Sequence, residues 1–404
     1  MQLPDGLGLL TYSTLVHAGD TWSQMRDSLA TYVPEVKARV SPDEPFGVSL
    51  RLSGKAAGVL AADPDERASL GDLLDREDLF VYTVNAFPHG PFKGASVMER
   101  VYEPDWTTEE RATYTCQVAD VLADLTLRAG RPGLSPSIQT APMAFAPKVG
   151  DEAYVSRFTS QVLRVVAHLA DLEARTGVRV KLAIEPEPAC YLETTPQTIA
   201  YFERLRDPRS VAELARVARL PLSEAEGALR RYLGVVFDMG HQAVGFEDVR
   251  ASLIALTEAG VPVFKLQAAA ALWVEDLDAD VVPALREFTD TIYLSQTTLQ
   301  QDGGRRSFLT LGEALDAYAG DLRPTELRTH FHVPVFLEEI GPFRTTRPAV
   351  QDALRLHREL PLSDHLEIET YTWDVLPEHL KTGSITDYVT RELEFVRQEL
   401  NTSG

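Results

Sequence analysis

Cysteine, positive charge and long apolar runs are all scarce in this chain, and each shortage excludes a class of protein. Two cysteines, Cys116 and Cys190, cannot supply the disulfide framework of a small secreted domain. No apolar stretch is long enough to cross a bilayer, so no membrane span is expected. The segment Met1 to Gly8 carries no basic cluster followed by an apolar run, which makes a cytoplasmic location the expectation.

Lysine and arginine are strongly outnumbered by acidic residues. The chain has 39 Lys and Arg residues against 60 Asp and Glu residues, which gives a formal net charge of −21. Such a surplus repels polyanions over most of the surface and therefore argues against nucleic acid as a partner. A net charge of this size also keeps a protein soluble, and from the sequence alone solubility is an equally good explanation of the acidic surplus.

Three common catalytic signatures are missing. The chain contains no G-x-x-x-x-G-K-[ST], no G-x-S-x-G and no C-x-x-C. P-loop nucleotide hydrolysis, serine esterase chemistry and thiol redox chemistry are therefore left without support. The segment Leu9 to Thr14, where the first apolar run ends, also lacks a glycine-rich turn. Because doubly wound open sheets usually carry such a turn, its absence favours a closed barrel.

What the sequence does contain is a regular alternation of short apolar runs with longer amphipathic stretches. This alternation is typical of βα units joined into a parallel sheet. It predicts an α/β fold, a (β/α)8 TIM barrel with inserted loops that occupies residues 1–404 as a single domain. Nine runs qualify as strands, one more than the barrel needs, so one is either an insertion strand or not a strand at all. The candidates are Leu7–Tyr12, Phe46–Leu52, Leu79–Ala86, Ser135–Thr140, Arg179–Glu185, Leu233–Asp238, Pro262–Gln267, Arg328–Phe336 and Leu366–Tyr371.

Residues that can bind a metal ion gather at the ends of five candidate strands. They are Glu185 and Glu187, Asp238 with His241, Gln267, His330 and His332, and Glu367 and Glu369. The tips of parallel strands meet at one end of a barrel, where α/β folds place their active sites. Burying several carboxylates there is costly unless protons or a cation neutralise them. The pattern therefore predicts a site for a divalent metal ion, Mn²⁺, Mg²⁺ or Zn²⁺.

Some of these residues also have a simpler interpretation. A glutamate at a strand end, such as Glu187, commonly forms a salt bridge or caps a helix. His332 lies between the apolar residues Phe331 and Val333, as a hydrogen-bonded core histidine would. From the sequence, both interpretations stay open.

A second polar segment follows the third candidate strand, where glycine and proline shape a turn around Asn85 and His89. We expect this turn to aim Asn85 and His89 at the barrel mouth and Lys93 to bind an anionic or carbonyl oxygen, although an ordinary structured loop fits equally well. Tyr371 and Trp373 follow the last strand and suit stacking on a sugar face or a ring, or a place in the core. Three insertions are expected to form a lid or walls around the site: Pro88–Asp105, Pro186–Pro196 and Leu272–Arg323.

Several of these motifs resemble xylose isomerase-like TIM barrels, a superfamily that includes sugar isomerases, ketose epimerases and endonuclease-IV-type phosphodiesterases. The strand-end motifs that carry the resemblance are Ala183–Pro188 (AIEPEP), Asp238–His241 (DMGH) and Ile368–Glu369. Over nearly the whole chain, the sequence also resembles the EboE family of bacterial metabolite traffic proteins. The segments that carry this second resemblance are Leu10–Tyr12, His17, Asn85–Gly90, Arg328–Pro334 and Glu367–Pro377, of which the last is the most specific.

The superfamily resemblance implies a glutamate, an aspartate, a histidine and a glutamate as metal ligands at four successive strand tips. Carried over to this chain, it gives Glu185, Asp238 and Glu369. The histidine position is different, because the strand after Asp238 ends in Gln267. Either Gln267 is the ligand, or His332 fills the place from the extra strand.

The expected function is a divalent-metal-dependent isomerase or epimerase that acts on a sugar or polyol in a secondary-metabolite pathway. Glu185 or Glu369 would move a proton between neighbouring carbons, while Lys93, His89 and His241 orient the substrate. The EboE resemblance implies an alternative, a non-catalytic binding or traffic protein whose partners are a small-molecule metabolite and proteins of the same export cluster. A metal-dependent phosphodiesterase is a third alternative, which the net charge of −21 disfavours. The sequence does not decide whether the chain is an enzyme.

Overall fold

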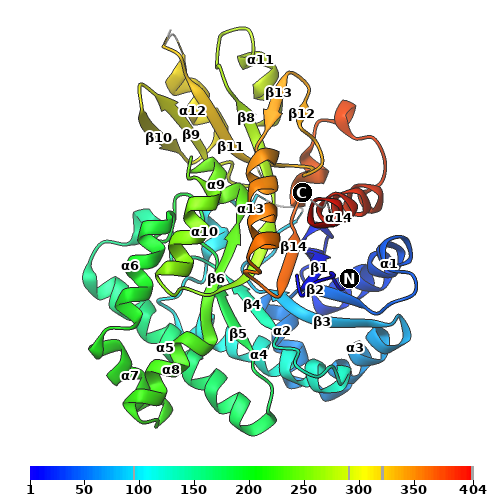
Figure 1. The fold of residues 1–404 in the computed structure, drawn as a ribbon, viewed down its shortest axis with the longest axis vertical. Coiled ribbons are helices and arrows are strands. Elements are labelled where there is room, and N and C mark those ends of the chain that lie inside the picture. Colours follow the sequence, from blue (N-terminus) through cyan, green and yellow to red (C-terminus); the bar gives the residue numbers. More distant parts are fainter. Residues whose placement is uncertain (94–95, 290–291, 320–322, 402–404) are drawn as a thin grey trace.

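Eight parallel strands form the centre of the molecule in the computed structural model, which describes residues 1–93, 96–289, 292–319 and 323–401 (Figure 1). Their order along the sheet is β1-β14-β7-β6-β5-β4-β3-β2. Their bounds are Leu9–Tyr12 (β1), Phe46–Arg51 (β2), Leu79–Asn85 (β3), Ser137–Thr140 (β4), Lys181–Ile184 (β5), Leu233–Asp238 (β6), Val263–Ala268 (β7) and His365–Ile368 (β14). A parallel bridge between Ser13 and Ser49 brings the two edges of the sheet together. The predicted (β/α)8 barrel is confirmed.

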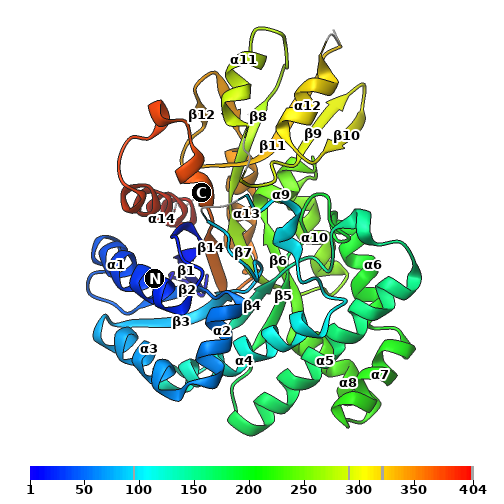
Figure 2. The ribbon, with the colours of Figure 1, turned by 180° about the vertical axis from the view of Figure 1, so that it is seen from behind.

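Helices cover the outside of the barrel and carry the chain from one strand to the next (Figures 1 and 2). Many begin at a side-chain cap, as at Thr108, whose hydroxyl accepts a hydrogen bond from the backbone N–H of Arg111. The helix bounds are Trp22–Val40 (α1), Gly54–Ala62 (α2), Pro64–Arg76 (α3), Glu109–Ala129 (α4), Glu152–Thr176 (α5), Thr195–Leu205 (α6), Pro208–Ala218 (α7), Leu222–Tyr232 (α8), Met239–Val244 (α9), Val249–Glu258 (α10), Arg347–Glu359 (α13) and Ile385–Asn401 (α14). No helix in the described ranges combines the length and the apolar character needed to cross a membrane.

Between β7 and β14 the chain builds a second sheet, which lies at the top of Figure 1. This insertion sheet is antiparallel, with the strand order β10-β9-β11-β8-β13-β12. Its strands and helices are Ala270–Val274 (β8), Val282–Leu285 (α11), Thr297–Gln301 (β9), Gly304–Phe308 (β10), Leu311–Tyr318 (α12), Glu326–Val333 (β11), Glu339–Ile340 (β12) and Phe343–Thr345 (β13). The insertion sheet therefore accounts for most of the residues that a barrel of this type does not need.

The surplus strand of the sequence prediction belongs to this insertion sheet. The predicted strand Arg328–Phe336 is β11, so it is an insertion strand and not a barrel strand. The other eight predicted strands are the eight strands of the barrel. Three of the missed strands of the insertion sheet lack the patterns that identify a strand: β10 is mostly exposed and basic, and β12 and β13 are very short. The strand β8 is a buried apolar run that the sequence analysis placed partly inside an insertion.

The register of the barrel strands places polar residues of neighbouring strands side by side. Asp238 on β6 is opposite Gln267 on β7, and Gln267 is opposite Glu367 on β14. Since side chains alternate in direction along a strand, Lys265 and Gln267 lie on one face of β7. Lys265 reaches Gln139 on β4 through the interior of the barrel. Polar side chains therefore line the inside of the barrel toward its carboxyl end.

Candidate metal centre

Three buried carboxylates from β5, β6 and β14 lie near one another at the carboxyl end of the barrel. Glu185 follows β5, Asp238 ends β6 and Glu369 follows β14. At most 6% of the surface of each residue is exposed. We call these three residues the carboxylate cluster. Among the described residues, Glu185 and Asp238, which are 53 positions apart along the chain, lie close enough to share one ion together with His241, whereas Glu369 lies near them but outside that group.

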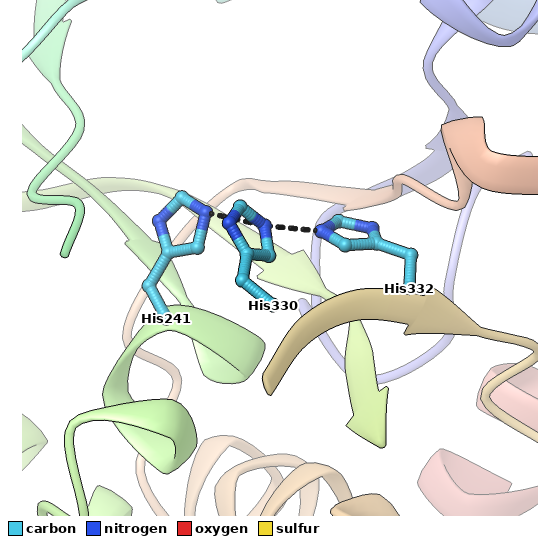
Figure 3. Close-up of side chains that lie close together, drawn as sticks. All are labelled: His241, His330 and His332. Atoms are coloured by element: carbon cyan, nitrogen blue, oxygen red, sulfur yellow. Dashed lines mark hydrogen bonds between the residues drawn. The ribbon is translucent and has the colours of Figure 1, made fainter. Parts of the chain in front are cut away.

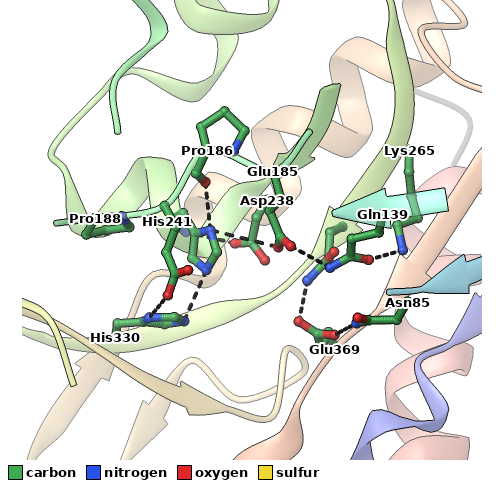
Figure 4. A network of polar contacts seen from close by, with 12 residues as sticks. Asn85, Gln139, Glu185, Pro186, Pro188, Asp238, His241, Lys265, His330 and Glu369 are labelled. Carbon is green, nitrogen blue, oxygen red and sulfur yellow. Dashed lines mark hydrogen bonds and ion pairs between the residues drawn. The ribbon is translucent and has the colours of Figure 1, made fainter. Parts of the chain in front are cut away.

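Neutral side-chain amides orient two of the three carboxylates (Figure 4). Gln139 donates a hydrogen bond to Glu185, with 2.5 Å between the nitrogen and the oxygen. Asn85 and Gln267 donate to the two oxygens of Glu369, at 2.8 Å and 2.5 Å. Hydrogen bonds from amides hold the carboxylates in place but do not neutralise their charge.

Two acceptor atoms of the site have no donor. Oδ1 of Asp238 accepts a hydrogen bond from the backbone N–H of His241 at 2.8 Å, but Oδ2 has no partner among the described residues. The amide oxygen of Gln267 is likewise unpaired within the described ranges. Buried oxygen acceptors without donors are costly, and a hard or borderline cation would satisfy them. The donor set of the cluster therefore fits a divalent metal ion.

The charges of the cluster also favour a bound cation. Burial, followed by the charges of Glu369 and Asp238, raises the pKa of Glu185 well above its usual value. Burial, followed by the charge of Glu367, raises the pKa of Glu369 in the same way. Lys265 is close by, but its ammonium group is 2.9 Å from Glu367, with which it forms a fully buried ion pair. The carboxylate cluster therefore requires protons or a metal ion for neutralisation.

Three histidines form a second group beside the carboxylates (Figure 3). His241 lies in α9, directly after β6, whereas His330 and His332 come from β11 of the insertion sheet. The Nε2 atom of His330 is 3.2 Å from Nε2 of His241 and 2.7 Å from Nε2 of His332. We call these residues the histidine cluster. Burial is the main cause that lowers the pKa of His330 well below its usual value and that of His332 to about 4.

A small cavity of about 50 Å³ opens above the two clusters. Its polar part includes Glu185, Glu369, His241 and His330. Its walls are mostly apolar and aromatic, and include Phe87, Phe92, Tyr102, Tyr293, Leu294 and Tyr371. Most of these wall residues come from the insertions that the sequence analysis expected to surround the site. A ligand in this cavity would place a polar end on the clusters and an apolar end against the walls.

Other predicted site residues lie outside this cavity. The ammonium group of Lys93 is 2.8 Å from a carboxylate oxygen of Asp374 and also bonds the carbonyl oxygen of Tyr371. The ring of His89 packs edge-on against Tyr114. The structure therefore does not bring Lys93 or His89 to the carboxylate cluster.

The structure also shows the surroundings of three residues for which the sequence left two interpretations open: Glu187, Tyr371 and Trp373. Glu187 accepts a hydrogen bond from the side-chain amide of Gln296 at 2.9 Å and lies 3.8 Å from the Nδ1 atom of His330. Tyr371 lines the cavity and packs against His332 in a tilted arrangement, with 4.5 Å between the ring centroids. Trp373 packs against Tyr388 instead. Of the two aromatic residues expected to contact a ligand, the structure places Tyr371 at the cavity.

Sequence reasoning missed several polar residues that position the site, chiefly Gln139, Lys265 and Gln296. Gln139 and Lys265 lie inside short strands that are buried in the barrel. The signal was present: Ser137 and Gln139 on β4, and Lys265 and Gln267 on β7, are polar residues two positions apart and hence on one face. Gln296 precedes β9 and had no comparable pattern around it.

Comparison with solved structures identifies the architecture. The chain is similar to a xylose isomerase-like TIM barrel protein from Mycobacterium smegmatis in complex with magnesium, with 12% identity over 99% of this chain and 98% of that chain and a TM-score of 0.52. The chain thus shares the TIM-barrel fold of this xylose isomerase-like protein. A D-tagatose 3-epimerase-like protein and the IOLI protein with a bound zinc atom are each 13% identical over 97% of both chains, at a TM-score of 0.47. No family model and no curated protein matches the chain.

Proposed function

We propose that this protein is a divalent-metal-dependent isomerase or epimerase that acts on a sugar or polyol. The observation that carries the proposal is the carboxylate cluster, three buried acidic side chains at the carboxyl end of the barrel below a cavity. The unpaired oxygens of Asp238 and Gln267 support it, because a metal ion would supply the missing electrostatic partner. The mycobacterial barrel of similar fold was solved in complex with magnesium, and this also supports a bound cation.

In this proposal Glu185, Asp238 and Glu369 hold the metal ion, and Gln267 supplies a fourth oxygen. The bound metal would polarise neighbouring carbonyl and hydroxyl groups of the substrate. Glu185 and Glu369 both line the cavity, so either can take a proton from one substrate carbon and return it to the same or the next carbon. Gln139 and Asn85 keep these two carboxylates in a fixed orientation through their hydrogen bonds. The apolar walls keep bulk water away from the exchanging proton.

The second candidate function is a metabolite-binding or traffic protein of the EboE type that does not turn over its ligand. The aromatic and aliphatic walls of the cavity favour it, because they suit an apolar metabolite better than a free sugar. In this case the purified protein would bind such a metabolite saturably and release it unchanged. A third function, phosphodiester hydrolysis of nucleic acid, remains disfavoured by the net charge of −21.

Proton exchange in ²H₂O tests the first candidate directly. The metal-loaded protein is incubated with a panel of aldoses, ketoses and cyclic polyol ketones, and deuterium incorporation at carbon is followed by NMR. We expect exchange with at least one substrate and a loss of about 100-fold or more in Glu369→Gln, because a general acid–base group is removed. The exposed carboxylate variant Glu275→Gln is the matched control and should exchange at the wild-type rate.

Metal binding provides the second arm of this test. Mg²⁺ or Mn²⁺ should raise the melting temperature of the wild-type protein, and Asp238→Asn should remove that increase. A protein that shows neither metal-dependent stabilisation nor proton exchange with any substrate of the panel would contradict the proposed function.

A further inference from the structure

The histidine cluster has an arrangement that hydrogen bonds alone do not explain. His241, His330 and His332 are all buried, and their rings point the Nε2 atoms toward one another (Figure 3). These contacts, 3.2 Å and 2.7 Å between nitrogens, are at hydrogen-bond distance. A hydrogen bond at each contact requires one nitrogen to carry a hydrogen, so the position of the ring hydrogens decides what this cluster is.

Two of the rings carry their hydrogen on the opposite nitrogen. Nδ1 of His241 is 2.9 Å from the carbonyl oxygen of Pro186, and Nδ1 of His332 is 2.5 Å from the carbonyl oxygen of Glu369. A carbonyl oxygen only accepts hydrogen bonds, so Nδ1 donates in both cases. A neutral imidazole carries a single N–H, and therefore Nε2 of His241 and of His332 presents a lone pair.

The third ring, His330, is fixed in the same way by Gln296. Its Nδ1 is 2.9 Å from the side-chain oxygen of Gln296. The orientation of this amide follows from its other contacts, because its nitrogen is 2.9 Å from a carboxylate oxygen of Glu187 and 3.3 Å from the carbonyl oxygen of Pro188, both of which only accept. The amide oxygen thus faces His330, whose Nδ1 donates to it. Nε2 of His330 also presents a lone pair.

Three lone pairs therefore face one another in a buried space, and no ring hydrogen lies between them. One additional proton on His330 would point at one neighbour only and would leave the other contact without a hydrogen. A metal ion satisfies all three nitrogens at once. Histidines that bind metals typically donate their outer N–H to a carbonyl, a carboxylate or a similar acceptor, as each of these three does.

We propose that the histidine cluster binds one divalent transition metal ion of the Zn²⁺ type. Three neutral imidazoles form a donor set that suits Zn²⁺ and other transition metals, whereas Mg²⁺ prefers oxygen ligands. His241 and His330 line the cavity, which gives the ion access from solvent.

This ion is distinct from the one assigned to the carboxylate cluster. The Nδ1 edge of the His241 ring faces the carboxylates, 4.0 Å from Glu185, and its Nε2 edge faces the other two histidines (Figure 4). The two clusters thus lie at opposite edges of one ring. The inference rests on the contacts of the imidazoles and stands whether or not the proposed reaction takes place.

Metal stoichiometry, measured on the full chain with Zn²⁺ alone and with Mg²⁺ alone, tests this proposal. After dialysis, the wild-type protein should retain two equivalents of Zn²⁺ by elemental analysis but, in titration calorimetry, bind a single equivalent of Mg²⁺. His330→Asn and His332→Asn, made separately so that one misfolded variant does not decide the result, should each lose one equivalent of Zn²⁺ and keep the Mg²⁺ equivalent. His168→Asn, a histidine that pairs with Asp120 far from the cluster along the chain, is the matched control and should behave as the wild type.

Replacement of Zn²⁺ by Co²⁺ gives an independent readout. Visible absorption of nitrogen-bound Co²⁺ should appear in the wild type and in His168→Asn and disappear in His330→Asn and His332→Asn, with circular dichroism as the check of folding. Two results would overturn the proposal: folded histidine variants that keep the full Zn²⁺ stoichiometry, or folded histidine variants that lose Mg²⁺ as well, which would indicate one shared ion. Loss of Zn²⁺ in the histidine variants together with an absence of Mg²⁺ binding would support the histidine site and count against the proposed carboxylate site.

Discussion

A buried ion pair lies beneath the carboxylate cluster, and the removal of one partner alone should be costly. Lys265 on β7 and Glu367 on β14 lie on adjacent strands, and both side chains are fully buried. The ammonium nitrogen is 2.9 Å from one carboxylate oxygen, and it also bonds the side-chain oxygen of Gln139. Gln139 in turn donates to Glu185. The ion pair is therefore the lowest part of a polar network that leads up to the proposed metal site.

Lys265→Met should destabilise the protein by about 3–5 kcal/mol, because it leaves the carboxylate of Glu367 buried without a cation. The second oxygen of Glu367 already has no partner among the described residues, so no other group is in place to compensate. The double variant Lys265→Met/Glu367→Met removes both charges and should recover most of that loss, since apolar residues of similar volume commonly replace buried ion pairs at little cost. We expect a favourable coupling energy of about 2 kcal/mol or more between the two positions.

Urea unfolding at pH 7, followed by far-ultraviolet circular dichroism, measures the four free energies of this cycle. The exposed ion pair between Arg344 and Glu275, with 2.7 Å between nitrogen and oxygen, is the matched control, and Arg344→Met should cost far less than Lys265→Met. The reasoning is refuted if Lys265→Met costs no more than the control, or if the losses of the two single variants simply add in the double variant.

Two further predictions concern other parts of the fold. Burial raises the pKa of Glu392 from 4.5 to about 7, so the folded chain binds this proton more tightly than the unfolded chain and stability falls as the pH rises from about 4.5 to about 7. Glu392→Gln keeps an acceptor for the two hydrogen bonds of this side chain. It should remove this pH dependence and raise the free energy of unfolding at pH 8 by up to about 3 kcal/mol. If the pH profile of stability were unchanged in this variant, Glu392 would not be its source. Gly234→Ala should cost about 1–3 kcal/mol, because a Cβ atom there would lie 2.5 Å from the carbonyl oxygen of Pro262. Gly227 in α8 has open space around it, so Gly227→Ala should stabilise the protein by about 0.5–1 kcal/mol. Thermal unfolding measures both variants, and a lower melting temperature for Gly227→Ala than for Gly234→Ala would refute both predictions.

The sequence by itself determined the barrel. Its eight strands are short apolar runs, such as Leu233–Asp238, that end in polar residues, and this local pattern needs no tertiary information to be detected. Because parallel strands all present their carboxyl ends at one side, the same pattern predicted that Glu185, Asp238 and Glu369 would meet. Strand polarity and side-chain alternation are properties of the local chain, which is why they could be inferred in advance.

The tertiary structure alone decided what surrounds those carboxylates. The insertion sheet is held together by antiparallel pairings between distant segments, and β11 could not be assigned to it from its own residues. The approach of His330 and His332 to His241 depends on where this sheet sits above the barrel. The same is true of Lys265, whose partner Glu367 lies 102 positions away. Such contacts depend on the packing of whole elements against one another, and local propensity and spacing carry no information about that packing.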